Sequence, residues 1–165
     1  RLLEYDITRS ISQVAQAKKP VVGIMSGLPV LGRPLDPSKK QQPLEPWVLA
    51  SELKRIFDVR EVPLTATKID DDIKVLLVIH PRDILEPAEY AIDQFVLRGG
   101  KLIAFTDTYA YFDQQPDLQN PLGGNAAGQS TLFNLFKGWG VEPSTGKVVA
   151  DLTFASGEGP RLLPT

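Results

Sequence analysis

Three short runs of nearly continuous apolar residues constrain the fold of this chain more than any other feature. They cover residues 21–25, 75–79 and 101–106, and segments with helical spacing lie between them. Apolar runs without polar alternation are typical of strands that are buried on both faces. Strands that alternate with helices form mostly parallel sheets covered by helices. The sequence therefore predicts an α/β fold with three layers and a mostly parallel sheet.

The segments around these runs predict four helices and two further strands. Helices are expected near residues 2–17, 46–57, 87–98 and 131–139, and strands at residues 59–64 and from residue 148. By analogy with flavodoxin-like sheets, we expect the strand order 2-1-3-4-5. The expected core residues of the three apolar runs are Val22, Ile24, Leu77, Ile79, Ile103 and Phe105.

Two segments of the chain are rich in residues that interrupt regular structure. Residues 27–46 contain five prolines and two glycines, which predicts a long loop. Residues 107–130 mix Asp, Gln, Asn, Pro and Gly, which predicts a polar, mobile loop without packed structure. The whole chain, residues 1–165, is expected to form a single α/β domain that includes both loops.

Composition excludes several classes of function. The chain has no cysteine, which excludes thiolate metal sites and a cysteine nucleophile. A single histidine makes a histidine-based metal site unfavourable, and no phosphate-binding glycine loop occurs, so we expect no metal and no cofactor. The net charge of −2, with scattered Lys and Arg, gives no basic face, so we expect no nucleic-acid partner.

Three polar residues follow predicted strands and are the candidate site. Ser26, His80 and Asp107 come directly after the three apolar runs, at the edge where parallel α/β sheets bind ligands. Their types could form a Ser-His-Asp relay. However, the sequence around Ser26 lacks the G-x-S-x-G turn that exposes a nucleophilic serine. We therefore expect these residues to bind a ligand or partner, and no catalytic residue is assigned.

Longer motifs resemble a known family. They are the segment Tyr5-Asp6-Ile7-Thr8-Arg9-Ser10-Ile11 before Lys18-Lys19-Pro20, Ser26-Gly27, His80-Pro81, the run from Tyr90 to Phe105 (YAIDQFVLRGGKLIAF), and Phe136-Lys137-Gly138-Trp139-Gly140-Val141. Together they resemble the GldG-type family of auxiliary proteins of ABC transport systems, a family named for gliding motility. The resemblance covers residues 1 to about 112 and resumes near residues 132–151.

This resemblance implies an extracytoplasmic, periplasmic domain of a larger membrane-anchored protein that works with an ABC permease and ATPase. Its implied fold is similar to that of class I glutamine amidotransferase-like domains, and no catalytic residues are carried over. The chain begins at Arg1 within a predicted helix, and no apolar run approaches the roughly 20 residues that span a bilayer. We therefore expect a fragment whose membrane segments lie outside this sequence. The alternative is a hydrolase or amidotransferase-like enzyme that uses the polar residues at the strand ends.

Overall fold

A parallel four-stranded sheet forms the centre of the molecule. The computed structural model describes residues 2–15, 18–34, 42–116, 125–144 and 147. The sheet has the order β2-β1-β3-β4, and its strands are β1 (Val21–Ser26), β2 (Asp58–Glu61), β3 (Ile73–Ile79) and β4 (Lys101–Phe105). The predicted order holds for these four strands. The strand expected from residue 148 lies outside the described residues.

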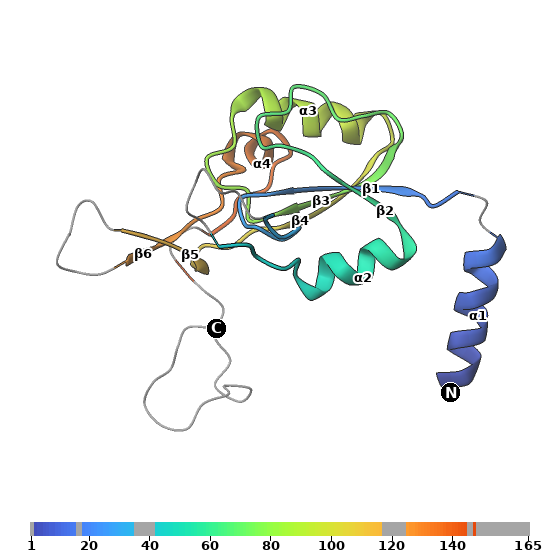
Figure 1. Ribbon diagram of the computed structural model, residues 1–165. Helices are drawn as coiled ribbons and strands as arrows, with labels where there is room; N and C mark the ends of the chain where they lie inside the picture. The colour runs from blue at the N-terminus through green and yellow to red at the C-terminus, as the bar shows by residue number, and fades with distance from the viewer. Residues whose placement is uncertain (1, 16–17, 35–41, 117–124, 145–146, 148–165) are drawn as a thin grey trace.

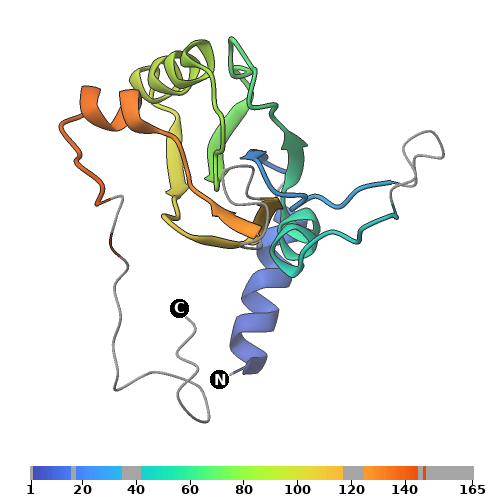
Figure 2. The same ribbon diagram turned by 90° about the vertical axis from the view of Figure 1, so that its left-hand side faces the viewer.

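Helices cover both faces of this sheet. The described helices are α1 (Leu2–Ala15), α2 (Val48–Ile56), α3 (Glu86–Leu97) and α4 (Phe133–Gly138). α2 lies on one face, α3 and α4 lie on the other, and α1 stands apart from the layers (Figures 1 and 2). The predicted α/β architecture with a mostly parallel sheet is confirmed.

β1 and β3 are the buried centre of the sheet, and their side chains divide between two apolar clusters. Val22, Ile24, Leu77 and Ile79 are buried on the side of α2, together with Ala50. The opposite side of the sheet packs against Phe95 and other residues of α3 and α4. The continuous apolar runs of β1 and β3 are explained by this double cover.

The prediction that Ile103 and Phe105 are core residues is wrong. β4 pairs with β3 so that these two residues lie beside Leu77 and Ile79, on the same face of the sheet. Their exposed fractions are nevertheless 48% and 54%. On this face of the sheet, α2 packs on β1, β2 and β3, and no described helix covers β4. The apolar sequence of β4 does not reveal that one of its faces is open.

The two breaker-rich segments differ in structure. Within residues 27–46, the described part contains no helix or strand beyond one bridge between Arg33 and Leu44. Within residues 107–130, β5 (Ala110–Pro116) and β6 (Asn125–Gly128) form an antiparallel pair. The expectation of no packed structure is therefore wrong for these strands, because main-chain pairing does not need apolar side chains. The mobility of the segment stays a prediction.

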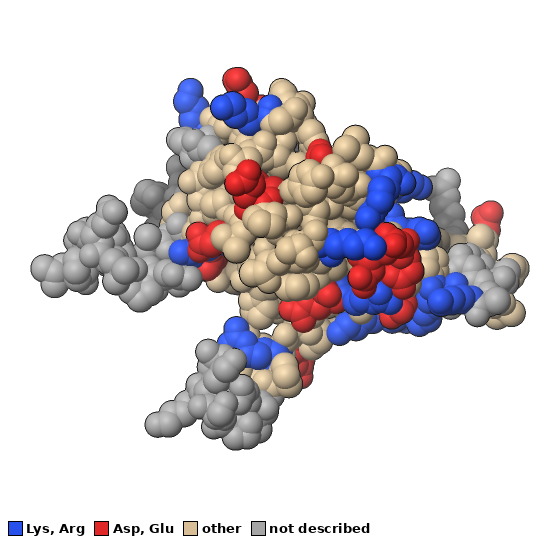
Figure 3. All heavy atoms as spheres, turned by 90° about the horizontal axis from the view of Figure 1, so that it is seen from above, with Lys and Arg blue, Asp and Glu red and all other residues tan. Residues whose placement is uncertain are grey.

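Charged residues of both signs lie side by side at the end of the molecule where the strands begin. Arg60 pairs with Asp70 and Asp72, each at 2.9 Å, and Asp71 lies within 3.3 Å of Arg98. The hydrogen bond from Arg60 lowers the pKa of Asp72. Figure 3 shows this mixture of signs on the face seen from above. It differs from the one-signed basic surface that binds a phosphate backbone.

Candidate functional site

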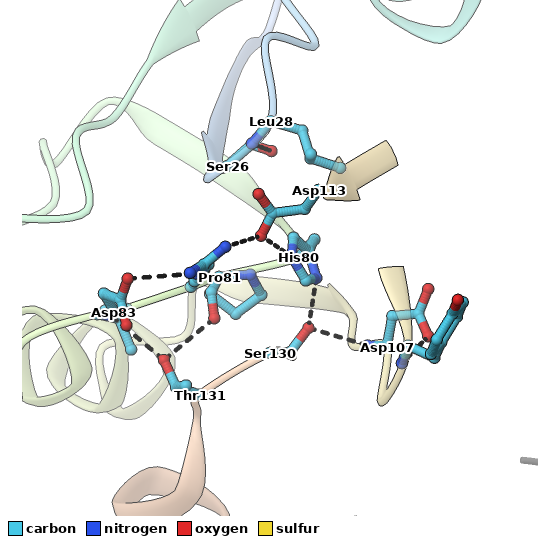
Figure 4. A network of polar contacts seen from close by, with 12 residues as sticks. Ser26, Leu28, His80, Pro81, Asp83, Asp107, Asp113, Ser130 and Thr131 are labelled. Carbon is cyan, nitrogen blue, oxygen red and sulfur yellow. Dashed lines mark hydrogen bonds and ion pairs between the residues drawn. The ribbon is translucent and has the colours of Figure 1, made fainter. Parts of the chain in front are cut away.

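The candidate site lies at the edge of the sheet where the strands end. β1 and β3 are neighbours, but the chain leads from β1 to β2 on one side and from β3 to β4 on the other. In open α/β sheets, ligands bind beside such a reversal of strand order, outside the carboxyl ends of the strands. Ser26, His80 and Asp107 all lie at this edge (Figure 4).

His80 is the centre of a buried polar network. Its main chain continues the sheet, since its N–H donates to the Phe105 carbonyl at 2.9 Å. Its ring is buried, with Nδ1 3.0 Å from the Ser130 hydroxyl and Nε2 3.0 Å from the Asp113 carboxylate. Its φ of 44° lies in the left-handed region, which few residues other than glycine adopt. The two ring contacts hold the residue in this conformation.

The network has one consistent direction of hydrogen bonding when the imidazole is neutral. An ionised carboxylate only accepts, so His80 Nε2–H donates to Asp113 and Nδ1 is left as an acceptor. The Ser130 hydroxyl then donates to Nδ1, and its oxygen accepts the Asp107 N–H at 2.9 Å. Every group in this chain of contacts has a partner.

Asp113 joins the network to a cation. Its Oδ2 accepts from Arg82 Nη1 at 2.8 Å as well as from His80. Burial alone would raise the pKa of Asp113, but the hydrogen bonds from Arg82 and His80 outweigh it, so the pKa is lowered. Because Asp113 belongs to β5 and Arg82 follows β3, this pair fastens the β5–β6 strands to the edge of the central sheet.

The structure connects the three sequence-predicted residues only in part. His80 reaches Asp107 through Ser130, but by the main-chain N–H of Asp107 and not by its carboxylate. That carboxylate accepts the Tyr109 N–H. The Ser26 hydroxyl accepts the Leu28 N–H at 3.0 Å and so stabilises the turn after β1. The Ser-His-Asp contact is made by Ser130 and Asp113 instead.

Sequence reasoning missed Ser130, Asp113 and Arg82. Ser130 and Asp113 lie in the segment expected to be a mobile loop, and a mobile loop offers no fixed partner for His80. The sequence holds one signal for each of the two segments that supply these residues. Ser130 and Thr131 precede an apolar helical run, which is typical of a helix start. The aromatic run from Tyr109 to Phe112 favours a strand.

Beside this network lies a mainly apolar pocket of about 260 Å³. Its lining residues come from the ends of the strands, from the residue before α2 and from β5; they are Leu28, Trp47, Ile79, His80, Phe105, Thr106, Asp107, Ala110 and Phe112. Trp47 and Phe112 meet edge to face, with ring centroids 6.0 Å apart. A pocket with aromatic walls and a few polar groups at one end is typical of a binding site.

A second pocket, of about 370 Å³, lies between α3 and α4. Two of the three carboxylates that line it have neutral partners: Glu89 accepts from Asn134, and Asp93 accepts from the Trp139 indole N–H at 2.8 Å. Trp139 is 40% exposed here. These hydrogen bonds join α4 to α3, so we assign this region a structural role.

The described residues show neither a metal cluster nor a membrane-spanning helix. Among them, no group of three or more His, Asp or Glu side chains is placed to hold a metal ion. None of the helices that the structure describes has the length and apolar composition needed to cross a membrane.

Comparison with known proteins places the chain in a family. The family described as "ABC-type uncharacterized transport system" matches residues 19–162. The chain is also 27% identical, over 145 residues, to a protein of Borreliella burgdorferi described as "Uncharacterized protein"; the match covers 85% of this chain and 26% of that protein. The chain thus spans about a quarter of the length of this relative. No solved structure matches it. Since the family match covers most of its length, the chain belongs to the ABC-type uncharacterized transport system family.

Proposed function

We propose that this chain is a non-catalytic binding and scaffolding domain of an ABC-type transport system. The observation that carries the proposal is the aromatic pocket at the carboxyl ends of the strands, where Phe105 and Phe112 are 54% and 78% exposed. Exposed aromatic side chains are enriched at protein interfaces, where an apolar side chain of the partner fills the pocket that they surround. The family membership supports a partner within the transport system, either the permease itself or its complex with the ATPase.

The location proposed for this domain is the extracytoplasmic, periplasmic side of the membrane. The resemblance of the motifs to those of GldG-type proteins supports this location. The parent protein would then carry the membrane anchor outside this sequence. The pocket would be the part of the domain that recognises a permease surface, and the His80 network would hold β5 and its Phe112 in position.

Phe112→Ser is expected to weaken capture of the permease by roughly tenfold or more, because truncating an aromatic anchor at an interface removes a large share of its binding energy. The measurement is the amount of the identified permease and ATPase subunits that the immobilised chain retains from detergent-solubilised membranes. Phe133→Ser is the matched control, since Phe133 is 43% exposed but lies on α4, outside the pocket. Equal loss with both variants, or no retained transporter subunit, would contradict the proposal.

A hydrolase is the second candidate function, because Ser130, His80 and Asp113 make the contacts of a Ser-His-Asp relay. Against it, Ser130 is 6% exposed and its oxygen already accepts the Asp107 N–H, so a substrate carbonyl has little access. We therefore expect the purified chain to hydrolyse no ester, amide or nucleotide substrate above background in a spectrophotometric assay. Turnover that disappears in Ser130→Ala would establish the enzyme instead.

A further inference from the structure

α1 carries an apolar stripe that no described element covers. Leu3, Ile7, Ile11 and Val14 lie on one side of the helix, and their exposed fractions are 72%, 50%, 63% and 87%. Figures 1 and 2 show the helix standing beyond the start of β1, away from the sheet. A helix of 14 residues is marginal in water, because most of its stability comes from packing its amphipathic face. α1 therefore requires a surface to pack against.

β4 carries an apolar face that no described helix covers. Lys101, Ile103 and Phe105 alternate along the strand and so lie on one face, where the two apolar side chains are about half exposed. The five residues of β4 extend about 17 Å and α1 extends about 21 Å, so one helix can cover the strand. The charges also match, because Lys101 lies at one end of this face and Glu4 flanks the stripe on α1.

The connection to β1 disfavours packing of α1 on β4 of the same chain. Lys19 Nζ donates to the Lys54 carbonyl at the end of α2, and α2 leads to β2, on the side of β1 opposite to β4. From there, α1 would have to cross two strand spacings, about 10 Å, and also rise about 10 Å above the sheet. These two displacements combine to about 14 Å, and the chain from Ala15 to Lys19 spans that distance only when it is fully extended. The α1 of a second copy has no such limit.

We infer that two copies of this chain associate by exchanging α1, so that α1 of each copy lies on the exposed face of β4 of the other. Both surfaces are present on every copy, so the contact is reciprocal and closes as a two-fold dimer. This goes beyond the proposed transporter contact, which uses the aromatic pocket. Phe105 borders both surfaces, whereas Ile103 does not line the pocket, so Ile103 is the position that tests the dimer alone.

The absence of cysteine from the chain allows a direct test. Chains carrying only Ile7→Cys are mixed with chains carrying only Ile103→Cys and are treated with a short, flexible bis-maleimide that joins two thiols. A helix axis about 10 Å above a sheet leaves facing Cα atoms about 8 Å apart, which is too far for a disulfide but within reach of the reagent. A crosslinked heterodimer therefore reports that α1 of one chain lies on β4 of another. Thr8→Cys is the matched control for Ile7→Cys, because Thr8 lies off the stripe. We expect roughly tenfold more heterodimer with Ile7→Cys than with Thr8→Cys.

The double variant Ile7→Cys/Ile103→Cys separates the two arrangements. In the dimer the bis-maleimide gives crosslinked pairs of chains, whereas docking of α1 within its own chain gives an internally crosslinked monomer and would overturn the inference. The solution mass of the unmodified chain, measured by light scattering over a concentration series, should be that of a dimer. Ile103→Ser should weaken this association by roughly tenfold while Phe133→Ser leaves it unchanged. A monomer at every concentration, or a dimer without the Ile7–Ile103 crosslink, would refute it.

Discussion

Asp113→Ala is expected to lower the free energy of unfolding by about 3 kcal/mol, because it leaves Arg82 and the His80 ring without their shared carboxylate. Removing one partner of a buried ion pair costs about 3–5 kcal/mol, and the 26% exposure of the Arg82 side chain places this pair at the lower end. Urea denaturation measures the change. Asp113→Asn, which keeps an acceptor but removes the charge, should lose about half as much.

Two further variants show whether the effect belongs to this site. Asp83 also pairs with Arg82, at 3.3 Å, but its carboxylate is 83% exposed, so Asp83→Asn should change stability by no more than about 0.5 kcal/mol. Gly128→Ala should reproduce part of the Asp113→Ala loss, because a Cβ at Gly128 would overlap the Asp113 carboxylate. Gly138→Ala adds a Cβ that meets nothing and should cause no loss. A full loss in Asp83→Asn would contradict the assignment.

The difference in stability between the unmodified chain and Asp113→Ala should depend on pH. The folded-state pKa of Asp113 is lowered, so its ionised form stabilises the native state above the unfolded pKa and this stabilisation is lost as the pH falls. The difference in unfolding free energy between the unmodified chain and Asp113→Ala should therefore narrow below about pH 4. Asp71 and Asp72 also have lowered pKa values, but they are present in both proteins and cancel in the difference.

The centre of the sheet could be predicted from the sequence because the burial of these strands follows from their own apolar residues. Val22, Ile24, Leu77 and Ile79 lie in continuous apolar runs, and such runs need cover on both faces whatever the rest of the chain does. Ile103 and Phe105 belong to an equally apolar run, yet they are about half exposed. Their burial depends on how far a helix on the other side of the sheet extends, and this information is absent from the run itself.

The location of the candidate site could be predicted from the sequence, but the residues that contact His80 there could not. The ends of parallel strands meet at one edge, so the positions of Ser26, His80 and Asp107 could be anticipated. The partners of His80 could not, because Ser130 and Asp113 are 50 and 33 residues away in the chain. They reach His80 through the β5–β6 pairing, which is set by main-chain hydrogen bonds within a polar segment and leaves little periodic signal in the side chains.

The His80 network also explains why a polar segment can be ordered at this edge. Ser130 N–H donates to the Asp107 carbonyl and Thr131 N–H donates to the Pro81 carbonyl, so the chain leaving β6 is bonded to the ends of β4 and β3. The side chains of Ser130 and Asp113 add the contacts to His80. Polar bonds at a part-buried edge therefore replace the apolar area that the segment lacks, and they position the aromatic residue Phe112 beside Trp47.

Phe95→Ala should give the largest loss of stability, about 3–5 kcal/mol, because it empties a fully buried ring site between α3 and the sheet. Leu97→Ala, on the same helix but 72% exposed, should change stability by no more than about 0.5 kcal/mol. Guanidinium denaturation measures both.

The packing against Phe95 can be tested further at Gly100, where an added Cβ would overlap the ring. Gly100→Ala alone should cost about 1–3 kcal/mol through overpacking. In the Phe95→Ala background the ring is gone, so Gly100→Ala should cost much less, with a coupling of about 1 kcal/mol or more between the two positions. Additive losses would show that the two residues are not in contact. They would then place α3 differently on the sheet, because Gly100 N–H donates to the Phe95 carbonyl in the turn that joins α3 to β4.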